Sequence, residues 1–240
     1  ELYRTHAVAG AALWVVPANM ASYADVDAFV EWVGTDRIDS AGGAKKLVKP
    51  AMTPTMLFPF AAPRVAGELS DAGARAEMEM KVLLWSVERL IGGLSAIGYD
   101  RDVDSRLHVV LPGSPNRGLF GGDGAYGEAK AALDAVTNRW KAERSWAERV
   151  TLAHARIGWV RGTGLMGHND VVAEAAEAAG VRTWSTQEMA EQLIALCDED
   201  SRRRAVDAPL EVDLTGGLAE AGLDLAALAK EAADAAVAEE

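Results

Sequence analysis

The sequence is nearly free of cysteine, and this scarcity excludes several kinds of fold and site. Cys197 is the only cysteine among 240 residues, so a disulfide framework and a cysteine-rich zinc site are both excluded. A single thiol suits a reducing compartment, and we expect a cytoplasmic protein with a buried, unreactive Cys197. Histidines show no metal-ligand spacing, so we expect no metal, and those within strand patterns are expected to be hydrogen-bonded in the core. The histidines are His6, His108, His154 and His168, of which His108 and His154 lie in strand patterns.

Long hydrophobic runs and an excess of positive charge are also missing. No segment approaches the about 18 consecutive apolar residues of a membrane-spanning helix, and the start at Glu1 lacks the pattern of a signal peptide. Because an initiator methionine is lacking too, we expect a piece of a longer protein. With 24 Lys and Arg against 36 Asp and Glu, the formal net charge is −12. Such a chain is a poor candidate for nonspecific binding to nucleic acid or an anionic membrane.

The residues that are abundant predict an α/β domain. Half of the residues are hydrophobic and 25% are charged, which supplies a sizeable core without disulfides or metal. Short apolar runs alternate with helical patterns, and this alternation favours a doubly wound parallel sheet with helices on both faces. We expect the domain to span residues 1–217 and a terminal helix or linker to span 218–240.

The expected elements follow from hydrophobic periodicity and from boundary residues. Ser22, followed three residues later by Asp25, predicts the start of a helix. Gly92-Gly93 is expected to end a long helix, and the polar segment 35–53 is expected to form a surface loop or insertion. Strands are expected at 13–16, 56–60, 107–111 and 150–157, and helices at 22–34, 70–91, 125–144, 170–179 and 186–197.

The stretch that joins the third expected strand to the next helix carries the most informative residues. Ser114 lies just past the carboxyl end of a strand, where open α/β sheets form their ligand crevice. Tyr126 and Lys130 are one helical turn apart, so their side chains face the same way. Hydride reduction of a ketone needs a proton donor, and a lysine ammonium beside a tyrosine lowers the pKa of the phenol. Because a serine hydroxyl can hold the same carbonyl oxygen, the spacing suits a carbonyl reductase.

Weaker patterns compete with this interpretation. A tyrosine four residues before a lysine is a common helical pair, so the pair alone is weak evidence. Segment 92–98 is similar to a nucleophile elbow, but its last glycine comes one residue late, which disfavours a serine hydrolase. Trp159 is a candidate for the wall of a substrate channel, and Arg161 either meets a phosphate or is solvated. Core packing is expected for Trp14, Trp32, Trp85 and Trp140.

Ser114, Tyr126 and Lys130 together resemble the catalytic trio of the short-chain dehydrogenase/reductase family. The run from Pro112 to Lys130, PGSPNRGLFGGDGAYGEAK, is more specific. It is similar to the ketoreductase domain of the type I fatty acid synthases of fungi and actinobacteria. The resemblance implies a Rossmann-like fold and covers nearly the whole chain, because it extends through residues 15–17, 59–62, 157–166 and 213–218.

This resemblance implies a reaction, the NADPH-dependent reduction of a 3-oxoacyl group on acyl carrier protein to the 3-hydroxyacyl form. Tyr126 would donate the proton, Lys130 would lower its pKa and hold the nicotinamide ribose, and Ser114 would orient the carbonyl. The implied partners are acyl carrier protein and other synthase domains in a homo-oligomeric assembly. The residues implied at the cofactor are Asn19 near the adenine, Phe60, Ala61 and Ala62 beside it, Gly158 and Thr163 near the carboxamide, and Tyr126 and Lys130.

Two features depart from the family pattern. The glycine-rich loop that would cradle the pyrophosphate is missing upstream of Tyr126, so we expect the chain to begin after that loop. NADPH rather than NADH is therefore implied by the resemblance alone. No Asn occurs between Pro63 and Pro115, and Ser86 is expected in the place of the family's helical Asn. Two other interpretations stay open: an inert structural fragment of the synthase, and a stand-alone short-chain reductase.

Overall fold

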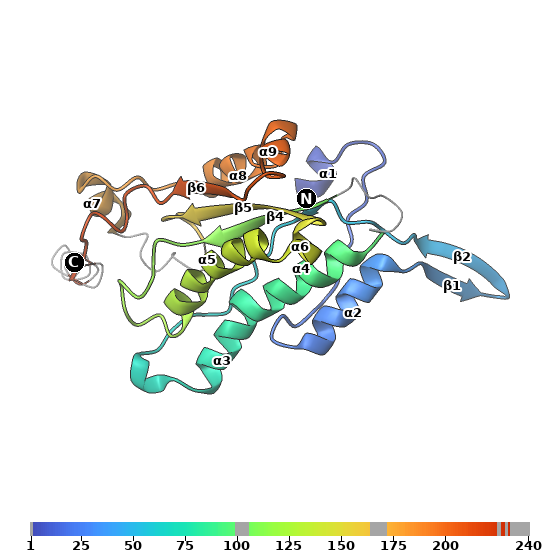
Figure 1. Cartoon of the computed structure of the whole chain (residues 1–240), viewed down its shortest axis with the longest axis horizontal. Helices are drawn as coiled ribbons and strands as arrows, with labels where there is room; N and C mark the ends of the chain where they lie inside the picture. The colour runs from blue at the N-terminus through green and yellow to red at the C-terminus, as the bar shows by residue number, and fades with distance from the viewer. Residues whose placement is uncertain (1, 99–105, 164–171, 225–226, 229, 231–240) are drawn as a thin grey trace, which may run out of the picture.

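A parallel sheet of four strands, in the order β3-β4-β5-β6, forms the centre of the computed structural model (Figure 1). The structure describes residues 2–98, 106–163, 172–224, 227–228 and 230. The strands are β1 Arg37–Ala41, β2 Ala44–Lys49, β3 Met56–Leu57, β4 Leu107–Gly113, β5 Val150–Ile157 and β6 Leu210–Leu214. The helices are α1 Leu2–His6, α2 Tyr23–Gly34, η1 Leu69–Asp71, α3 Ala74–Met80, η2 Lys81–Trp85, α4 Ser86–Ala96, α5 Tyr126–Ala142, α6 Arg144–Ala147, α7 Ala173–Ala178, α8 Thr186–Ala195 and α9 Glu199–Arg204.

Helices cover both faces of this sheet, as the alternation of strand and helix patterns predicted. Helices α2, α4 and α5 lie on one side of it, and α8 and α9 lie on the other (Figure 1). Neighbouring residues of a strand point to opposite faces, and the core divides accordingly. Val109 and Leu152 pack in the core beneath α4 and α5, whereas Val110 and Ala153 pack against Met189 of α8 and its neighbours. The doubly wound α/β arrangement is confirmed.

Several boundaries match the sequence expectations closely. The Ser22 side chain accepts a hydrogen bond from the Asp25 N–H, so α2 begins with the expected cap. Strand β5 occupies the expected range, and β4 continues two residues beyond its expected end, through Pro112 and Gly113. The apolar face of α5 is buried as expected, with Leu133, Val136 and Trp140 in the core. The expected second strand is shortened to Met56–Leu57, which pairs in parallel with β4.

The strand expected at 13–16 is wrong. This segment is irregular and mostly exposed, with Val15 84% exposed. A strand needs a partner for its backbone hydrogen bonds, and no strand of the described chain pairs with this segment. Trp14 instead packs edge-on against Trp32 of α2, with 5.9 Å between ring centroids. Trp14 and Trp85 are each more than a third exposed, so the expectation of core positions for these two tryptophans is also wrong.

The helix that was expected to end at Gly92-Gly93 continues through both glycines to Ala96. It begins at Ala74 and runs through α3, the π-helical turn η2 and α4. Gly93 serves the packing of α4 against α2 and does not end the helix. A Cβ at this position would lie 3.0 Å from both methyl carbons of Val30 on α2, so the glycine allows α2 and α4 to approach closely.

The segment expected as a surface loop, 35–53, contains the β1–β2 hairpin. Its two-residue turn, Gly42-Gly43, has φ values of 60° and 82°, which L side chains rarely adopt. Lys49 at the end of β2 is fully buried, and its ammonium donates to the carbonyl oxygens of Val33 at 3.2 Å and Thr35 at 2.9 Å. This lysine therefore fastens the hairpin to the carboxyl end of α2.

Other elements were not expected from the sequence: α1, α6, α9 and β6. Residues 164–166 of segment 157–166, which carries part of the family resemblance, lie outside the described residues, as do His168, the start of the helix expected at 170–179 and most of 218–240. In the described part of the chain, none of the helices has both the length and the apolar composition that crossing a membrane requires.

Candidate active site

Ser114, Tyr126 and Lys130 come together at the carboxyl end of β4. Ser114 is the first residue after this strand, Tyr126 opens α5, and Lys130 lies one turn further along the same helix. Each of the three residues is at most 9% exposed, and the Ser114 side chain is close enough to Tyr126 to lower the pKa of the phenol. The chain thus brings together, in a largely buried place, the three residues that the sequence analysis selected.

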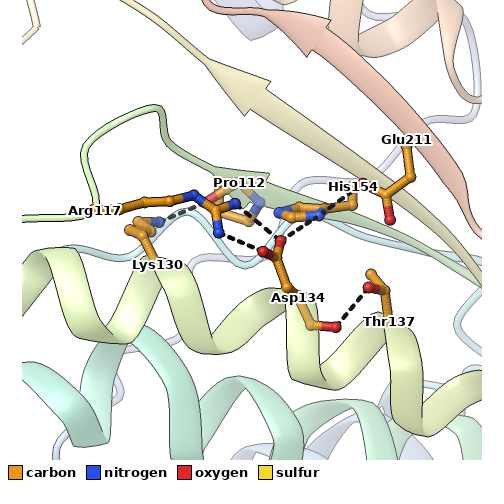
Figure 2. Close-up of polar contacts among 7 residues, drawn as sticks. All are labelled: Pro112, Arg117, Lys130, Asp134, Thr137, His154 and Glu211. Carbon is orange, nitrogen blue, oxygen red and sulfur yellow. Dashed lines mark hydrogen bonds and ion pairs between the residues drawn. The ribbon is translucent and has the colours of Figure 1, made fainter. Parts of the chain in front are cut away.

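Lys130 reaches from α5 to the end of the strand. Its Nζ donates to the carbonyl oxygen of Pro112 at 2.6 Å (Figure 2). The same atom lies 5.4 Å from the ring centroid of Tyr126. Burial disfavours the charged ammonium and lowers the pKa of Lys130 to about 8. A buried group with a shifted pKa near a tyrosine ring is typical of a functional site.

The environment of Tyr126 acts on its hydroxyl in two directions. Burial raises the pKa of Tyr126 most strongly, the Ser114 hydroxyl lowers it, and the charge of Asp123 raises it again. The net direction in this structure is upward. The expectation that Lys130 lowers the pKa of Tyr126 stays a prediction.

Asn116 shapes the loop between Ser114 and Tyr126, and the sequence analysis missed it. Its backbone N–H donates to the Ser114 hydroxyl oxygen at 3.1 Å, and its side-chain amide donates to Asp123 at 2.8 Å. Its side-chain carbonyl accepts from the N–H groups of Gly118 and Leu119. An Asn directly after Pro115 is a recognised turn signal, so the sequence held a clue to this role.

A network of charged side chains lies beside the site on α5, β5 and β6. Figure 2 shows Asp134 between Arg117, which follows Ser114 in the loop, and His154 of β5. Arg117 holds the Asp134 carboxylate with two guanidinium nitrogens, which lowers the pKa of Asp134. The Nδ1 atom of His154 lies 3.7 Å from Asp134 and 3.1 Å from Glu211 of β6. This network links the loop that carries Ser114 to the helix that carries Tyr126 and Lys130.

The two strand histidines are buried, as expected. His108 Nδ1 contacts the Thr151 hydroxyl at 2.8 Å and its Nε2 contacts the Leu196 carbonyl at 3.0 Å, and burial lowers its pKa. His154 is also fully buried, and burial lowers its pKa despite the carboxylates of Glu211 and Asp134. Cys197 is half-buried just beyond α8, and burial raises the pKa of its thiol, which is consistent with an unreactive cysteine.

The residues implied at the nicotinamide end of the cofactor follow β3 and β5, the two strands on either side of β4. Phe60, Ala61 and Ala62 come shortly after β3 and are exposed, while Gly158 follows β5 directly and Thr163 lies a few residues beyond. The carboxyl ends of parallel strands share one edge of the sheet, so these segments flank the one that carries Ser114. The Tyr126 hydroxyl and the Lys130 ammonium are suitable donors for sugar hydroxyls. The residues present thus fit the nicotinamide and ribose half of a dinucleotide.

Three of the residues implied at the cofactor have local roles as well. A Cβ on Gly158 would lie 2.2 Å from the carbonyl oxygen of Thr215, so only glycine fits where β5 and β6 end side by side. The Thr163 hydroxyl donates to the Val160 carbonyl at 3.0 Å. Asn19 is exposed before α2, and its side-chain carbonyl accepts from the Ala21 N–H at 2.9 Å.

Ser86, expected in the place of a helical Asn, is fully buried, and its hydroxyl donates to the Met20 carbonyl at 2.6 Å. It therefore ties α4 to the segment before α2. Trp159 is fully buried and packs with Val172, Ala176 and their neighbours rather than presenting a surface. Arg161 forms an ion pair with Glu177 at 3.5 Å.

Comparisons with known proteins agree with this geometry. No family model matches the chain. It is 37% identical over 221 residues to the fatty acid synthase subunit alpha of Saccharomyces cerevisiae, and 38% identical over 220 residues to the fatty acid synthase alpha subunit hexA of Dothistroma septosporum. These alignments cover 91% of this chain but only 11% and 12% of the relatives, so the chain spans about a tenth of their length.

Solved structures show the same fold at low sequence identity. A short-chain dehydrogenase/reductase from Serratia marcescens superposes with a TM-score of 0.63 at 18% identity, covering 90% of this chain and 81% of that one. A 4-hydroxyisoleucine dehydrogenase complexed with NADH gives a TM-score of 0.57 at 14% identity, covering 70% of each chain. The chain has the short-chain dehydrogenase/reductase fold, and it is homologous to a region of the fungal fatty acid synthase alpha subunit.

Proposed function

We propose that this chain, a homologue of a region of the fungal fatty acid synthase alpha subunit, is a 3-oxoacyl-ACP reductase domain that uses NADPH. The observation that supports this most is the buried constellation of Ser114, Tyr126 and Lys130 at the carboxyl end of β4, where the Ser114 hydroxyl lowers the pKa of Tyr126. Residues 1–217 are proposed as the reductase domain and 218–240 as a terminal helix or linker. The proposed setting is a cytoplasmic fatty acid synthase.

Each side chain has a defined task in the proposed reaction. When bound, the reduced nicotinamide would supply a hydride to the 3-keto carbon, and the products would be NADP⁺ and the 3-hydroxyacyl thioester. The Tyr126 hydroxyl gives its proton to the carbonyl oxygen, and Ser114 donates a hydrogen bond to that oxygen as negative charge develops. Lys130 holds the ribose hydroxyls and favours the tyrosinate that remains after proton transfer.

The proposed partners follow from the same proposal. The 3-oxoacyl group would arrive as a thioester on acyl carrier protein, and other domains of a homo-oligomeric synthase would surround this one. Two elements of the cofactor proposal come from the resemblance: the choice of NADPH and the position of Asn19 near the adenine. Phe60, Ala61, Ala62, Gly158 and Thr163 are proposed to line the nicotinamide end, because they follow β3 and β5 on either side of Ser114.

The test is NADPH consumption with a short 3-oxoacyl thioester, followed by absorbance. The 240-residue chain is measured beside a version extended upstream in its gene, each with Tyr126→Phe and with the control Tyr23→Phe. Tyr23 opens α2 and is 38% exposed, so its loss should leave turnover unchanged. Loss of turnover with Tyr126→Phe alone, at nearly unchanged NADPH affinity, would support the proposal. Wild-type turnover of Tyr126→Phe, or no turnover in either length of chain, would contradict it.

A further inference from the structure

Glu79 of α3 is a fully buried acidic residue, and acidic side chains are almost never fully buried without partners. Its carboxyl group meets two backbone donors from distant parts of the chain. Oε2 accepts from the Ala125 N–H at 2.7 Å, and Oε1 accepts from the Ala66 N–H at 3.4 Å. Ala125 is the residue directly before Tyr126 and the N-cap of α5. The carboxyl group therefore holds the chain at the point where the helix of Tyr126 and Lys130 begins.

This contact takes the place of one bond of a capping box, the bond that the N–H of the N-cap residue donates. An N-cap residue with a side-chain acceptor stabilises the first turn, but Ala125 has none. In a capping box, an acidic residue three positions later would accept from the N-cap N–H. Glu128 occupies that position yet is exposed, and the Ala125 N–H is donated to Glu79 instead. The start of α5 is thus fixed by a residue of α3 rather than by the helix itself.

The surrounding backbone is shaped around this carboxyl group. Gly124 has a φ of 58°, and a Cβ there would lie 2.4 Å from Oε2 of Glu79. Gly67 accepts from the Gly124 N–H at 2.9 Å and donates to the Gly122 carbonyl at 3.1 Å. Glu79 and segment 66–67 therefore both form hydrogen bonds with the last residues of the loop that separates Ser114 from Tyr126.

The ring of Tyr126 packs against residues that neighbour Glu79 in the sequence. Tyr126 packs with Leu83 of η2 and Ala129 of α5 in a small buried cluster, and Met80, the residue after Glu79, packs against it. A displacement of about 1 Å at a reacting group can cost about 10²-fold in rate. We propose that Glu79 is a positioning residue, which sets the place of Tyr126 relative to Ser114 by holding the Ala125 N–H. This role rests on the proposed reductase function.

The experiment compares three substitutions at Glu79 with one matched control. Glu79→Gln keeps an oxygen that accepts from the Ala125 N–H, whereas Glu79→Met and Glu79→Ala remove both acceptors. Glu77→Met on the same helix is the control, because the Glu77 side chain is 60% exposed and pairs with Lys81 at the surface. Steady-state kcat, KM and the pH profile are measured for 3-oxoacyl thioester reduction. Tyr126 is titrated separately by ultraviolet difference absorbance against Tyr126→Phe.

The expected result is a loss of about 10- to 100-fold in kcat for Glu79→Met and Glu79→Ala, with KM and NADPH affinity changed less than about threefold. The midpoint of the Tyr126 titration should shift in these two variants. Glu79→Gln should keep kcat within about threefold of wild type, because one hydrogen bond to the helix start remains. If only one of Glu79→Met and Glu79→Ala folds, the kcat of that variant alone tests the proposal.

Several outcomes would overturn the proposal. One is a wild-type kcat for a folded Met or Ala variant, and another is an equal loss of kcat and NADPH affinity with an unmoved tyrosine titration. Failure of both variants to fold, with Glu79→Gln at wild-type turnover, would assign Glu79 a purely structural role. High turnover of Tyr126→Phe would instead refute the reductase mechanism, and the ultraviolet titration of the Glu79 variants would still report on the position of the helix start.

Discussion

Lys130 Nζ donates a hydrogen bond to the carbonyl oxygen of Pro112, 2.6 Å away, and so joins the beginning of α5 to the carboxyl end of β4. Lys130 itself is only 6% exposed to solvent. An ammonium in such a place has one good acceptor and little water, and burial lowers its pKa to about 8. A fully charged Lys130 at neutral pH therefore costs stability, which is expected at sites built for chemistry rather than for folding.

The pH dependence of stability should reveal this cost. The ordinary pKa of lysine, 10.5, applies to the unfolded chain, whereas the folded pKa is about 8. Between these values the unfolded state binds more protons than the native state, so the free energy of unfolding should rise with pH. The gain for this one group is about 3 kcal/mol. In Lys130→Met it should be absent, and urea unfolding of both proteins from pH 7 to pH 10 measures the difference.

The control is Lys45→Met, because Lys45 is exposed on β2. Its unfolding free energies should run parallel to those of the wild type across the whole range. Effects of titrating groups away from Lys130 cancel when each variant is compared with wild type at the same pH, and repeating the comparison in a Tyr126→Phe background removes the contribution of the neighbouring Tyr126. Parallel curves for wild type and Lys130→Met would show that Lys130 keeps an ordinary pKa in the folded protein.

Ser114→Ala should damage the reaction more than the fold. The Ser114 oxygen accepts from the Asn116 N–H at 3.1 Å, and its hydroxyl lowers the pKa of Tyr126. Its loss should reduce kcat by about 10²- to 10³-fold, raise the tyrosine titration midpoint, and cost about 1 kcal/mol of stability. Ser95→Ala is the matched control, since Ser95 is equally buried but bonds only to the Gly92 carbonyl in α4. Turnover of Ser114→Ala equal to that control would remove Ser114 from the proposed mechanism.

The parts of the fold that the sequence predicted well are those that local chemistry determines. A cap such as Ser22 with Asp25, or a continuous apolar run such as 150–157, carries its own boundary signals. The failures occur where an isolated segment does not decide the outcome. The apolar run at residues 13–16 predicted a strand, yet a strand forms only beside a second strand that accepts its hydrogen bonds, and local sequence does not reveal whether one is there. The β1–β2 hairpin did carry a local signal, the Gly42-Gly43 turn, which the polar composition of the segment obscured.

The candidate site divides in the same way. Ser114, Tyr126 and Lys130 could be selected because their types and spacing fit one chemistry, and the structure places them together. Glu79 could not be found from the sequence, because its partner Ala125 lies 46 residues away and is joined through a backbone N–H. A buried carboxyl group in a helix that also carries Glu77 looks like one more charged surface residue until the packing is known.

The glycine pair in α4 offers a direct test of why the helix continues through it. Gly92 is exposed, and a Cβ there would meet no atom within 4 Å. Gly92→Ala should therefore raise the free energy of unfolding by about 0.5–1 kcal/mol, because glycine is a poor helix former. Gly93→Ala should forfeit this gain, because its Cβ would press on both methyl carbons of Val30 at 3.0 Å.

Urea unfolding of the single variants and of the double variant Gly93→Ala with Val30→Ala measures the effect. Removing the Val30 methyl groups makes room, so Gly93→Ala should be less costly in the Val30→Ala background than in the wild type, and the difference between the two costs is the coupling energy. Gly92→Ala with Val30→Ala should show no such coupling, because Gly92 does not face α2. Equal effects of the two glycine substitutions in both backgrounds would mean that helix propensity alone governs this pair, and that close contact between α2 and α4 does not require Gly93.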